Sequence, residues 1–310
     1  MLYGDDTFGY HARMSATAGR TSVAGSFMVV GAAASWGTWS LFLRPSGLPP
    51  TVTGPLLFLV MGVVCLPWCW RLPRAQWTPR IAWLLVANGV FDALNVLAFF
   101  SALEHTTVAI AVLTHYLAPC VIALAAPYID RQRSPGALPA AAVALAGLVL
   151  VLTPWQTSHN AGNVGVGALL GAGSAVCYAG NVFVVGRVAM VLGPIRAMSY
   201  HALIAGVLLL PLGLVDVNML NSSNFALLAT AAITIGAISG VLFVAGLERI
   251  GSARAAVLTY AEPLVAVLIG VVYWHEAASA WAVLGGVLIA GAGLFTVLAR
   301  PTSRTASNDT

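Results

Sequence analysis

Ten apolar stretches, each long enough to cross the hydrocarbon core of a bilayer, constrain this chain more than any other feature. They occupy residues 25–43, 52–70, 81–103, 107–127, 137–155, 164–185, 195–215, 225–247, 252–273 and 279–299. The links between them are short, often under ten residues, so no extramembrane domain fits between two stretches. The sequence therefore predicts an all-α polytopic membrane protein with ten transmembrane helices.

Composition excludes a soluble fold. Only 8% of the 310 residues are charged, whereas soluble domains carry about 25%. The net charge of +4 comes from arginines without a basic stripe, so we expect contact with the lipid bilayer and none with nucleic acid. The four cysteines fall inside apolar stretches with no metal-ligand spacing, which predicts neither a metal site nor a cofactor.

Arginine placement predicts the orientation of the helices. With an intracellular N-terminus, thirteen arginines fall in cytoplasmic segments and only Arg44 falls outside, as the positive-inside rule requires. We therefore expect a multi-pass protein of the inner (plasma) membrane with both termini cytoplasmic. Residues 1–22 are then a disordered leader, starting at Met1 or Met14, and residues 300–310 are a tail. The first apolar stretch is too long for a cleaved signal peptide.

The two halves of the chain repeat one another. A shift of 144 residues aligns the third, fourth and fifth spans with the eighth, ninth and tenth, and a shift of 142 aligns the first span with the sixth. The pairs that support this alignment are Phe99 with Phe243, Glu104 with Glu248, Tyr116 with Tyr260, Pro119 with Pro263, and Trp36 with Tyr178. Because five is an odd number of spans, the second copy must enter the membrane in the opposite sense. We predict two inverted five-helix repeats, residues 23–155 and 163–299.

These repeats resemble the drug/metabolite transporter superfamily, and its ten-span EamA-type exporters in particular. The motifs that carry the resemblance are Leu103-Glu104, Leu247-Glu248, Glu262-Pro263-Leu264 and His275-Glu276. Family members often carry Gly-Glu at the end of the fourth span as well, where this chain has residues 130–133, Asp-Arg-Gln-Arg. Any role of that acid must therefore rest on Glu276 alone, or on none. The resemblance implies export of small metabolites, amino acids or drugs, and it leaves the substrate open.

Two carboxylates fall at mid-membrane depth, where ionisable groups are costly and mark functional sites. Asp92 lies in the third span on a polar helical face that is expected to turn towards a water-filled interior. That face consists of Asn88, Asp92, Asn95 and Phe99. Glu262 lies in the ninth span. A buried carboxylate can exchange protons near neutral pH, so each is a candidate for proton coupling or for pairing with a cationic substrate. A purely structural hydrogen-bonding role is the alternative.

Other side chains extend this candidate site. His115 and His201 are candidate proton carriers, with a packing role as the alternative. Pro119 and Pro263 should kink their helices, either as hinges or as static shaping of a cavity. Aromatic and amide side chains of the first, fourth, sixth and ninth spans are expected to line the substrate pathway. They are Trp36, Trp39, Tyr116, Tyr178, Asn181 and Tyr260.

Two acidic links look structural. Glu104 and Glu248 fall in tight links before Thr106 and Ser252, which suit helix N-caps.

The leading prediction is a secondary active transporter that exports a small amphipathic or aromatic molecule by alternating access, with protons as the candidate coupling ion. A nucleotide-sugar or sugar-phosphate exchanger is the nearest alternative, but no arginine lies at mid-depth to bind an anion. A membrane enzyme or a structural membrane protein is the alternative of another class. The six histidines form no ligand box, and no nucleotide-binding G-x-x-x-x-G-K-S/T motif occurs. We therefore expect no enzyme activity, and the oligomeric state stays open.

Overall fold

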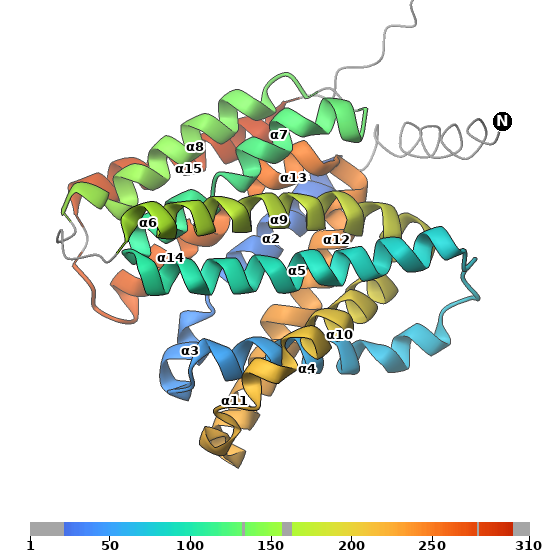
Figure 1. Cartoon of the computed structure of the whole chain (residues 1–310). Helices are drawn as coiled ribbons and strands as arrows, with labels where there is room; N and C mark the ends of the chain where they lie inside the picture. The colour runs from blue at the N-terminus through green and yellow to red at the C-terminus, as the bar shows by residue number, and fades with distance from the viewer. Residues whose placement is uncertain (1–21, 132–133, 157–162, 278, 300–310) are drawn as a thin grey trace, which may run out of the picture.

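Ten membrane-length helical spans make up the molecule, which confirms the predicted fold class (Figure 1). The computed structural model describes residues 22–131, 134–156, 163–277 and 279–299, and these residues contain no strand. In chain order the ten spans are α2 (Ser22–Trp36) with α3 (Ser40–Ser46), α4 (Pro50–Arg71), α5 (Pro79–His105), α6 (Val108–His115) with α7 (Ala118–Ile129), α8 (Ala137–Leu152), α9 (Val164–Leu192), α10 (Pro194–Gly213), α11 (Ser222–Ala231) with the π-helical segment η3 (Ala232–Ile238) and α12 (Ser239–Ile250), α13 (Ser252–Leu258) with α14 (Ala261–Val272), and α15 (Ala280–Leu298). The expected leader, apart from Ser22, and the expected tail lie outside the described residues.

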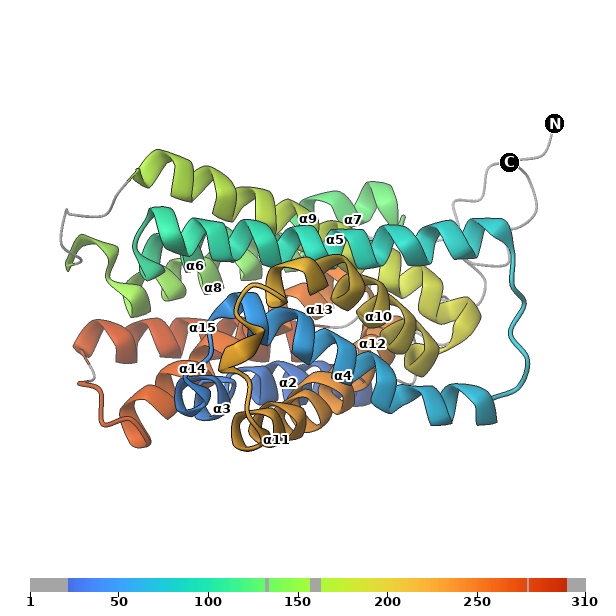
Figure 2. The same ribbon diagram turned by 60° about the horizontal axis from the view of Figure 1, so that its bottom comes forward.

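The bundle has two chemically different ends. Successive spans run in opposite directions, so odd-numbered spans begin at one end and even-numbered spans finish there (Figure 2). We call this end, which carries Arg71, Arg187, Arg196 and Arg249, the arginine-rich end. The other is called the Arg44 end, after the arginine that lies there.

Helix pairing follows the pseudo-symmetry of two inverted repeats. Helix α5 packs along α9, which pairs the third span with the sixth, and α2 packs along α12, which pairs the first span with the eighth. Swapping the two halves converts one of these pairings into the other. Helices α4 and α10, α7 and α13, and α8 and α15 join equivalent spans of the two halves directly. All five pairings cross from one half to the other, so the core is largely an interface between the repeats.

The backbone supports the 144-residue register of the repeat. Arg131 follows α7 with φ 53°, and His275 follows α14 with φ 56°. Such left-handed conformations are uncommon for residues other than glycine. Arg131 and His275 are 144 residues apart, so the two repeats turn at the same position after their fourth and ninth spans.

The fifth and tenth spans approach closely because glycines face each other. A Cβ on Gly285 would lie 2.3 Å from the Gly147 carbonyl oxygen, whereas one on Gly291 of the same helix would meet no other described atom within 4 Å. We expect Gly285→Ala to lower the free energy of unfolding by about 1–3 kcal/mol through overpacking. Gly291→Ala should leave it unchanged or raise it by up to about 1 kcal/mol, because alanine favours the helix. Thermal unfolding in detergent compares the two, and equal losses would contradict the packing argument.

Candidate functional site

Three spans are interrupted near the middle of the bundle. The first span breaks at residues 37–39, the fourth at residues 116–117 and the ninth at residues 259–260. The last two breaks are equivalent in the repeat. Pro119 is the second residue of α7 and Pro263 the third residue of α14, so each proline begins a new half-helix, where a missing amide hydrogen leaves no bond unmade. Their role as hinges remains a prediction.

Direct contacts bring the three breaks together. A Cβ on Gly37 would lie 2.5 Å from the Glu262 carbonyl oxygen, so the first break rests on the start of α14. The Tyr260 hydroxyl donates to the Tyr116 carbonyl oxygen at 2.7 Å, which joins the ninth break to the fourth, and the two rings lie 5.7 Å apart. Interrupted helices near the bilayer midplane form the binding sites of many inverted-repeat transporters.

His115 occupies the centre of an aromatic cluster beside these breaks. The centroid of its ring lies 4.9 Å from that of Phe99, 5.5 Å from that of Tyr116 and 5.7 Å from that of Tyr178. Its Nδ1 atom lies 2.6 Å from the Ser174 hydroxyl oxygen. Sequence reasoning missed Ser174, because one serine in a helix of small residues carries no signal. The four rings come from the third, fourth and sixth spans, and their role in a substrate pathway stays a prediction.

Tyr178 lies within electrostatic range of both mid-span carboxylates, Asp92 and Glu262. The Glu262 carboxylate also interacts with the Tyr116 phenol. Glu262 is in the first turn of α14, where the positive end of the helix dipole favours a negative charge. One acid from each half therefore lies within electrostatic range of the same aromatic cluster, although the two come from non-equivalent spans.

Asp92 makes its closest contact with His201, which ties the third span to the seventh. Oδ2 of Asp92 lies 2.9 Å from Nε2 of His201, and the two side chains are only 13% and 5% exposed. Nδ1 of His201 lies 2.6 Å from the Ala197 carbonyl oxygen. The sequence indicated both residues separately, but nothing in it joined them.

The polar stripe around Asp92 is buried or half-buried and incompletely hydrogen-bonded among the described residues. Asn88 is fully buried, and neither its amide oxygen nor its amide nitrogen has a partner among the described residues. One amide atom each of Asn95 and Asn181 is also buried without a partner there. The repeat counterpart of residues 88–95 is residues 232–239, most of which form the π-helical segment η3. The two halves thus differ in helix type where one carries polar groups, and π-helical turns are frequent at functional sites.

The aromatic residues of the first span make separate contacts. The centroid of the Trp36 ring lies 5.1 Å from that of Phe243, the repeat counterpart of Phe99. Trp39 lies in the break between α2 and α3, and the described chain gives its ring no aromatic partner. Trp36 and Phe243 therefore form a second, smaller aromatic contact on the side of α2 and α12.

At the arginine-rich end, the Asp130 carboxylate bonds to side chains of α9 and α13. Its Oδ1 atom accepts from Arg187 Nη2 at 3.3 Å, and its Oδ2 atom accepts from the Ser252 hydroxyl at 2.5 Å. Arg187 also donates to the Ile129 carbonyl oxygen at 2.9 Å. We call Asp130, Arg187 and Ser252 the Asp130 clamp. Burial raises the pKa of Asp130 above its ordinary range, although the Ser252 hydrogen bond and the Arg187 charge each act to lower it.

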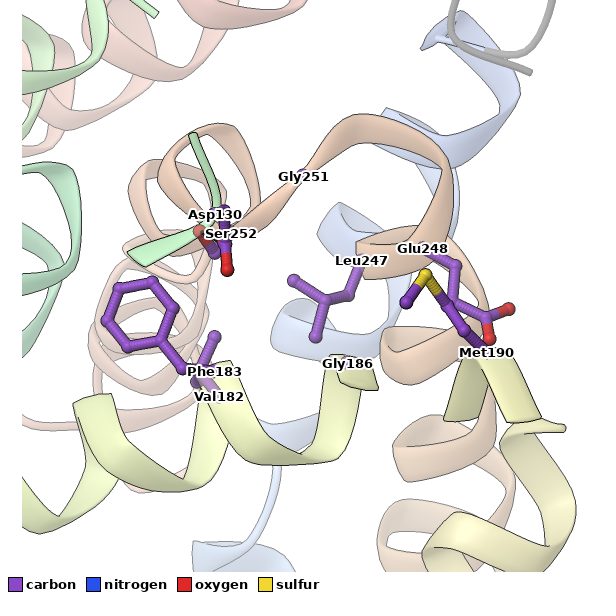
Figure 3. Close-up of a pocket in the computed structure, with 9 residues that line it drawn as sticks. All are labelled: Asp130, Val182, Phe183, Gly186, Met190, Leu247, Glu248, Gly251 and Ser252. Carbon is purple, nitrogen blue, oxygen red and sulfur yellow. Dashed lines mark hydrogen bonds between the residues drawn. The ribbon is translucent and has the colours of Figure 1, made fainter. Parts of the chain in front are cut away.

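The clamp borders a small, partly open pocket, in which Asp130 and Ser252 lie together and Leu247 projects between them and Glu248 (Figure 3). Its walls are Asp130, Val182, Phe183, Gly186, Met190, Leu247, Glu248, Gly251 and Ser252.

The prediction that Thr106 and Ser252 are N-caps was wrong. Helix α6 is capped by Thr107, whose side chain accepts from the Ile110 amide at 3.3 Å. Helix α13 starts after Gly251, and Ser252 is its first residue. The Ser252 hydroxyl is therefore free to donate to Asp130.

Arg44 and Glu276 form the counterpart of the clamp at the other end. Arg44 Nη2 donates to Glu276 Oε1 at 2.7 Å, and the guanidinium lies 4.9 Å from the centre of the Trp274 ring. We call Arg44 and Glu276 the Arg44 pair; both side chains are 52% exposed. The 142-residue shift places Arg44 opposite Gly186, one residue before Arg187. Related positions of the two repeats thus supply an arginine to an ion pair at each end.

The sequence profile of the EamA-like transporter family matches residues 23–153 and, a second time, residues 165–298. The chain belongs to this family. An uncharacterized transporter of Archaeoglobus fulgidus is 30% identical over 268 residues, which cover 86% of this chain and 93% of that protein. The uncharacterized transporter YcbK of Bacillus subtilis is 29% identical over 138 residues, or 42% of this chain and 44% of that one. A solved crystal structure shares the fold, with a TM-score of 0.76 at 24% identity over 89% of this chain and 98% of that one.

The family match of this EamA-family transporter confirms the resemblance inferred from its repeats and motifs. The match to the family profile occurs once in each half, as expected for two copies of one five-helix unit. In the described part of the chain, no group of three or more His, Cys, Asp or Glu side chains is arranged to hold a metal ion.

Proposed function

We propose that this transporter exports small amphipathic or aromatic molecules across the inner membrane by alternating access, with proton entry driving substrate exit. In this proposal both termini, and hence the arginine-rich end, face the cytoplasm. The observation that carries it is the meeting of three helix breaks beside an aromatic cluster that one carboxylate from each half borders. Such a site can bind a small molecule at mid-depth and change its own charge there.

The chemistry of the site favours a substrate with an apolar ring and a cationic amine. The rings of Phe99, Tyr116 and Tyr178 offer apolar surface and faces that attract cations. Asp92 and Glu262 supply the negative charge. Among the described residues no arginine lies at the helix breaks, which argues against an anionic substrate such as a sugar phosphate.

The two ion pairs support alternating access. The Asp130 clamp joins the first half to the second at the arginine-rich end, and the Arg44 pair joins them at the opposite end. If one half rocks against the other, the contact at one end separates while the other is kept. Each end thus has its own ion pair that can hold it closed, as exchange between inward-open and outward-open states requires.

The experiment that tests the proposal measures export from reconstituted vesicles under imposed pH gradients. A growth screen under overexpression, with toxic amino acid analogues and cationic aromatic compounds, first selects the test substrate. We expect the wild-type chain to move this substrate in the direction opposite to the flow of protons down their gradient. Asp92→Asn and Glu262→Gln should lose the gradient-dependent component, because an amide cannot carry the proton.

Glu104→Gln is the matched control for these variants. Glu104 is an exposed carboxylate near the end of α5, outside the site, so its neutralisation should leave gradient-dependent export unchanged. Full gradient-dependent export by both Asp92→Asn and Glu262→Gln would show that neither acid carries the coupled proton.

A further inference from the structure

The hydrogen bonds of His201 determine how many protons its contact with Asp92 holds. Nδ1 lies 2.6 Å from the Ala197 carbonyl oxygen, which can only accept, so the network assigns a hydrogen to Nδ1. Nε2 lies 2.9 Å from Asp92 Oδ2, a distance that requires a second hydrogen between these atoms. Either an imidazolium faces a carboxylate, or a neutral imidazole accepts from a carboxylic acid. Both forms hold one proton in the contact.

We propose that Asp92 and His201 act as a single proton-carrying pair, and that loss of the shared proton separates the third span from the seventh. The proposal rests on the proton coupling proposed above and adds His201 as its second residue. Helix α5 belongs to the first half and α10 to the second, so the pair lies across the interface between the halves. Proton release is thereby linked to movement of one half against the other.

Removing the shared proton leaves one hydrogen for two contacts. If it stays on Nδ1, Nε2 and Asp92 Oδ2 face each other as two acceptors at 2.9 Å, and the carboxylate has a negative charge and no donor where the side chains are 13% and 5% exposed, which is unfavourable. If it moves to Nε2, Nδ1 and the Ala197 carbonyl oxygen face each other as two acceptors at 2.6 Å, so the ring is no longer held against Ala197. Water around the carboxylate would relieve this cost, and the close packing of α5 against α10 restricts its entry. A Cβ on Gly89, one turn from Asp92, would lie 2.5 Å from Ile204 of α10, so the helices must move apart to admit water.

Asp92 is the charged group that faces His201 within hydrogen-bond distance. Tyr178 of α9 is the next titratable neighbour and lies within electrostatic range of Asp92. The other titratable or charged side chains on α10 and on the helices packed against it are Cys65, Cys69 and Arg71 on α4, Arg80, Glu104 and His105 on α5, Cys177 and Arg187 on α9, Arg196 and Tyr200 on α10, and Glu248 and Arg249 on α12. Because Tyr178 also borders Glu262, the charge of the pair acts on the proposed substrate site.

The test measures separation of α5 from α10 as a function of pH, without substrate. Spin labels are placed at Leu94 and Val207, both exposed, in the full chain with its four cysteines replaced by alanine. In the wild-type background, the ratio of separated to closed molecules should rise with pH, by up to about tenfold per pH unit, because one proton is released on separation. Asp92→Asn should remain closed at every pH, since its amide always supplies a hydrogen to Nε2.

Two further variants distinguish proton exchange from a purely structural contact. Asp92→Glu keeps an exchangeable proton and should keep the slope with a shifted midpoint, whereas His201→Gln should abolish the slope. Glu104→Gln on the same helix should behave as wild type. A wild-type slope in Asp92→Asn, or a flat profile in the wild type, would overturn the proposal. If the slope is present but vesicles show no proton-coupled export, the pair stands and the proposed coupling fails.

Discussion

Replacing Arg187 with glutamine is expected to open the arginine-rich end of the transporter, whereas the same change at Arg44 should leave the opposite end nearly unaffected. The Arg187 and Asp130 side chains are 25% and 8% exposed, so Arg187→Gln leaves a buried carboxylate without its charge partner. Such losses cost about 3–5 kcal/mol, and we expect the lower value because Ser252 still donates to Asp130. The exposed Arg44 pair is worth about 0–1 kcal/mol.

The rate at which a buried thiol reacts measures this opening. Val182 lines the pocket next to the clamp and is 1% exposed, so Val182→Cys in the cysteine-replaced chain reacts only when this end opens. A change of about 3 kcal/mol predicts a roughly hundredfold faster reaction in Arg187→Gln, against at most about fivefold in Arg44→Gln. Adding Asp130→Asn to Arg187→Gln removes the buried charge and should restore slow labelling. Equal labelling in both arginine variants would contradict the clamp.

The pH dependence of the same labelling follows from the pKa of Asp130. Burial raises this pKa in the closed state, so the closed state binds the proton more tightly than an open state with a hydrated carboxyl. The contribution of Asp130 to closure is therefore complete below the ordinary aspartate pKa of about 3.9, and it is lost as the pH rises through the raised value. In Arg187→Gln the pKa should rise further, which moves this loss to higher pH. Acidification should accordingly slow labelling of Arg187→Gln.

Asn88→Leu is expected to stabilise the fold and abolish transport. Asn88 is fully buried, and both of its polar side-chain atoms lack partners among the described residues. Each buried unsatisfied polar group costs about 1–3 kcal/mol, so an apolar side chain of similar size should raise the unfolding temperature in detergent. Such a costly group is retained where function uses it, and we expect Asn88 to bind substrate or water once the halves separate. Vesicle export and thermal unfolding are measured on the same preparation.

Asn224 provides the matched control. It is also buried, but its side chain accepts from the Asn221 amide at 2.8 Å and donates to the Met219 carbonyl oxygen at 3.0 Å. Asn224→Leu should therefore lose about 1 kcal/mol of stability by breaking the capping box of α11. Retained transport in Asn88→Leu would remove Asn88 from the pathway, and a fall in its unfolding temperature would mean that its amide is satisfied in the membrane.

Hydropathy and arginine placement were enough to predict the ten spans because lipid leaves the chain few alternatives. Backbone amides in hydrocarbon must bond within their own segment, so each long apolar stretch becomes a helix. The repeat was equally visible, since the Glu, Tyr and Pro matches in one register are rare in such a composition. Asp92 and Glu262 were identifiable for the same reason, as carboxylates that are too costly in lipid to be incidental.

The partners of these residues came only from the tertiary structure. His201 lies in another half of the chain from Asp92, and no local pattern links them. The break in the first span contains no proline; α2 ends where Gly37 meets the Glu262 carbonyl oxygen, a contact between distant segments. The sequence placed Asp130 in a link and Arg187 near a span end, but which acid each arginine pairs with depended on how the inverted halves pack. Helix formation in lipid is a local property of each segment, whereas charge pairing depends on distances between segments.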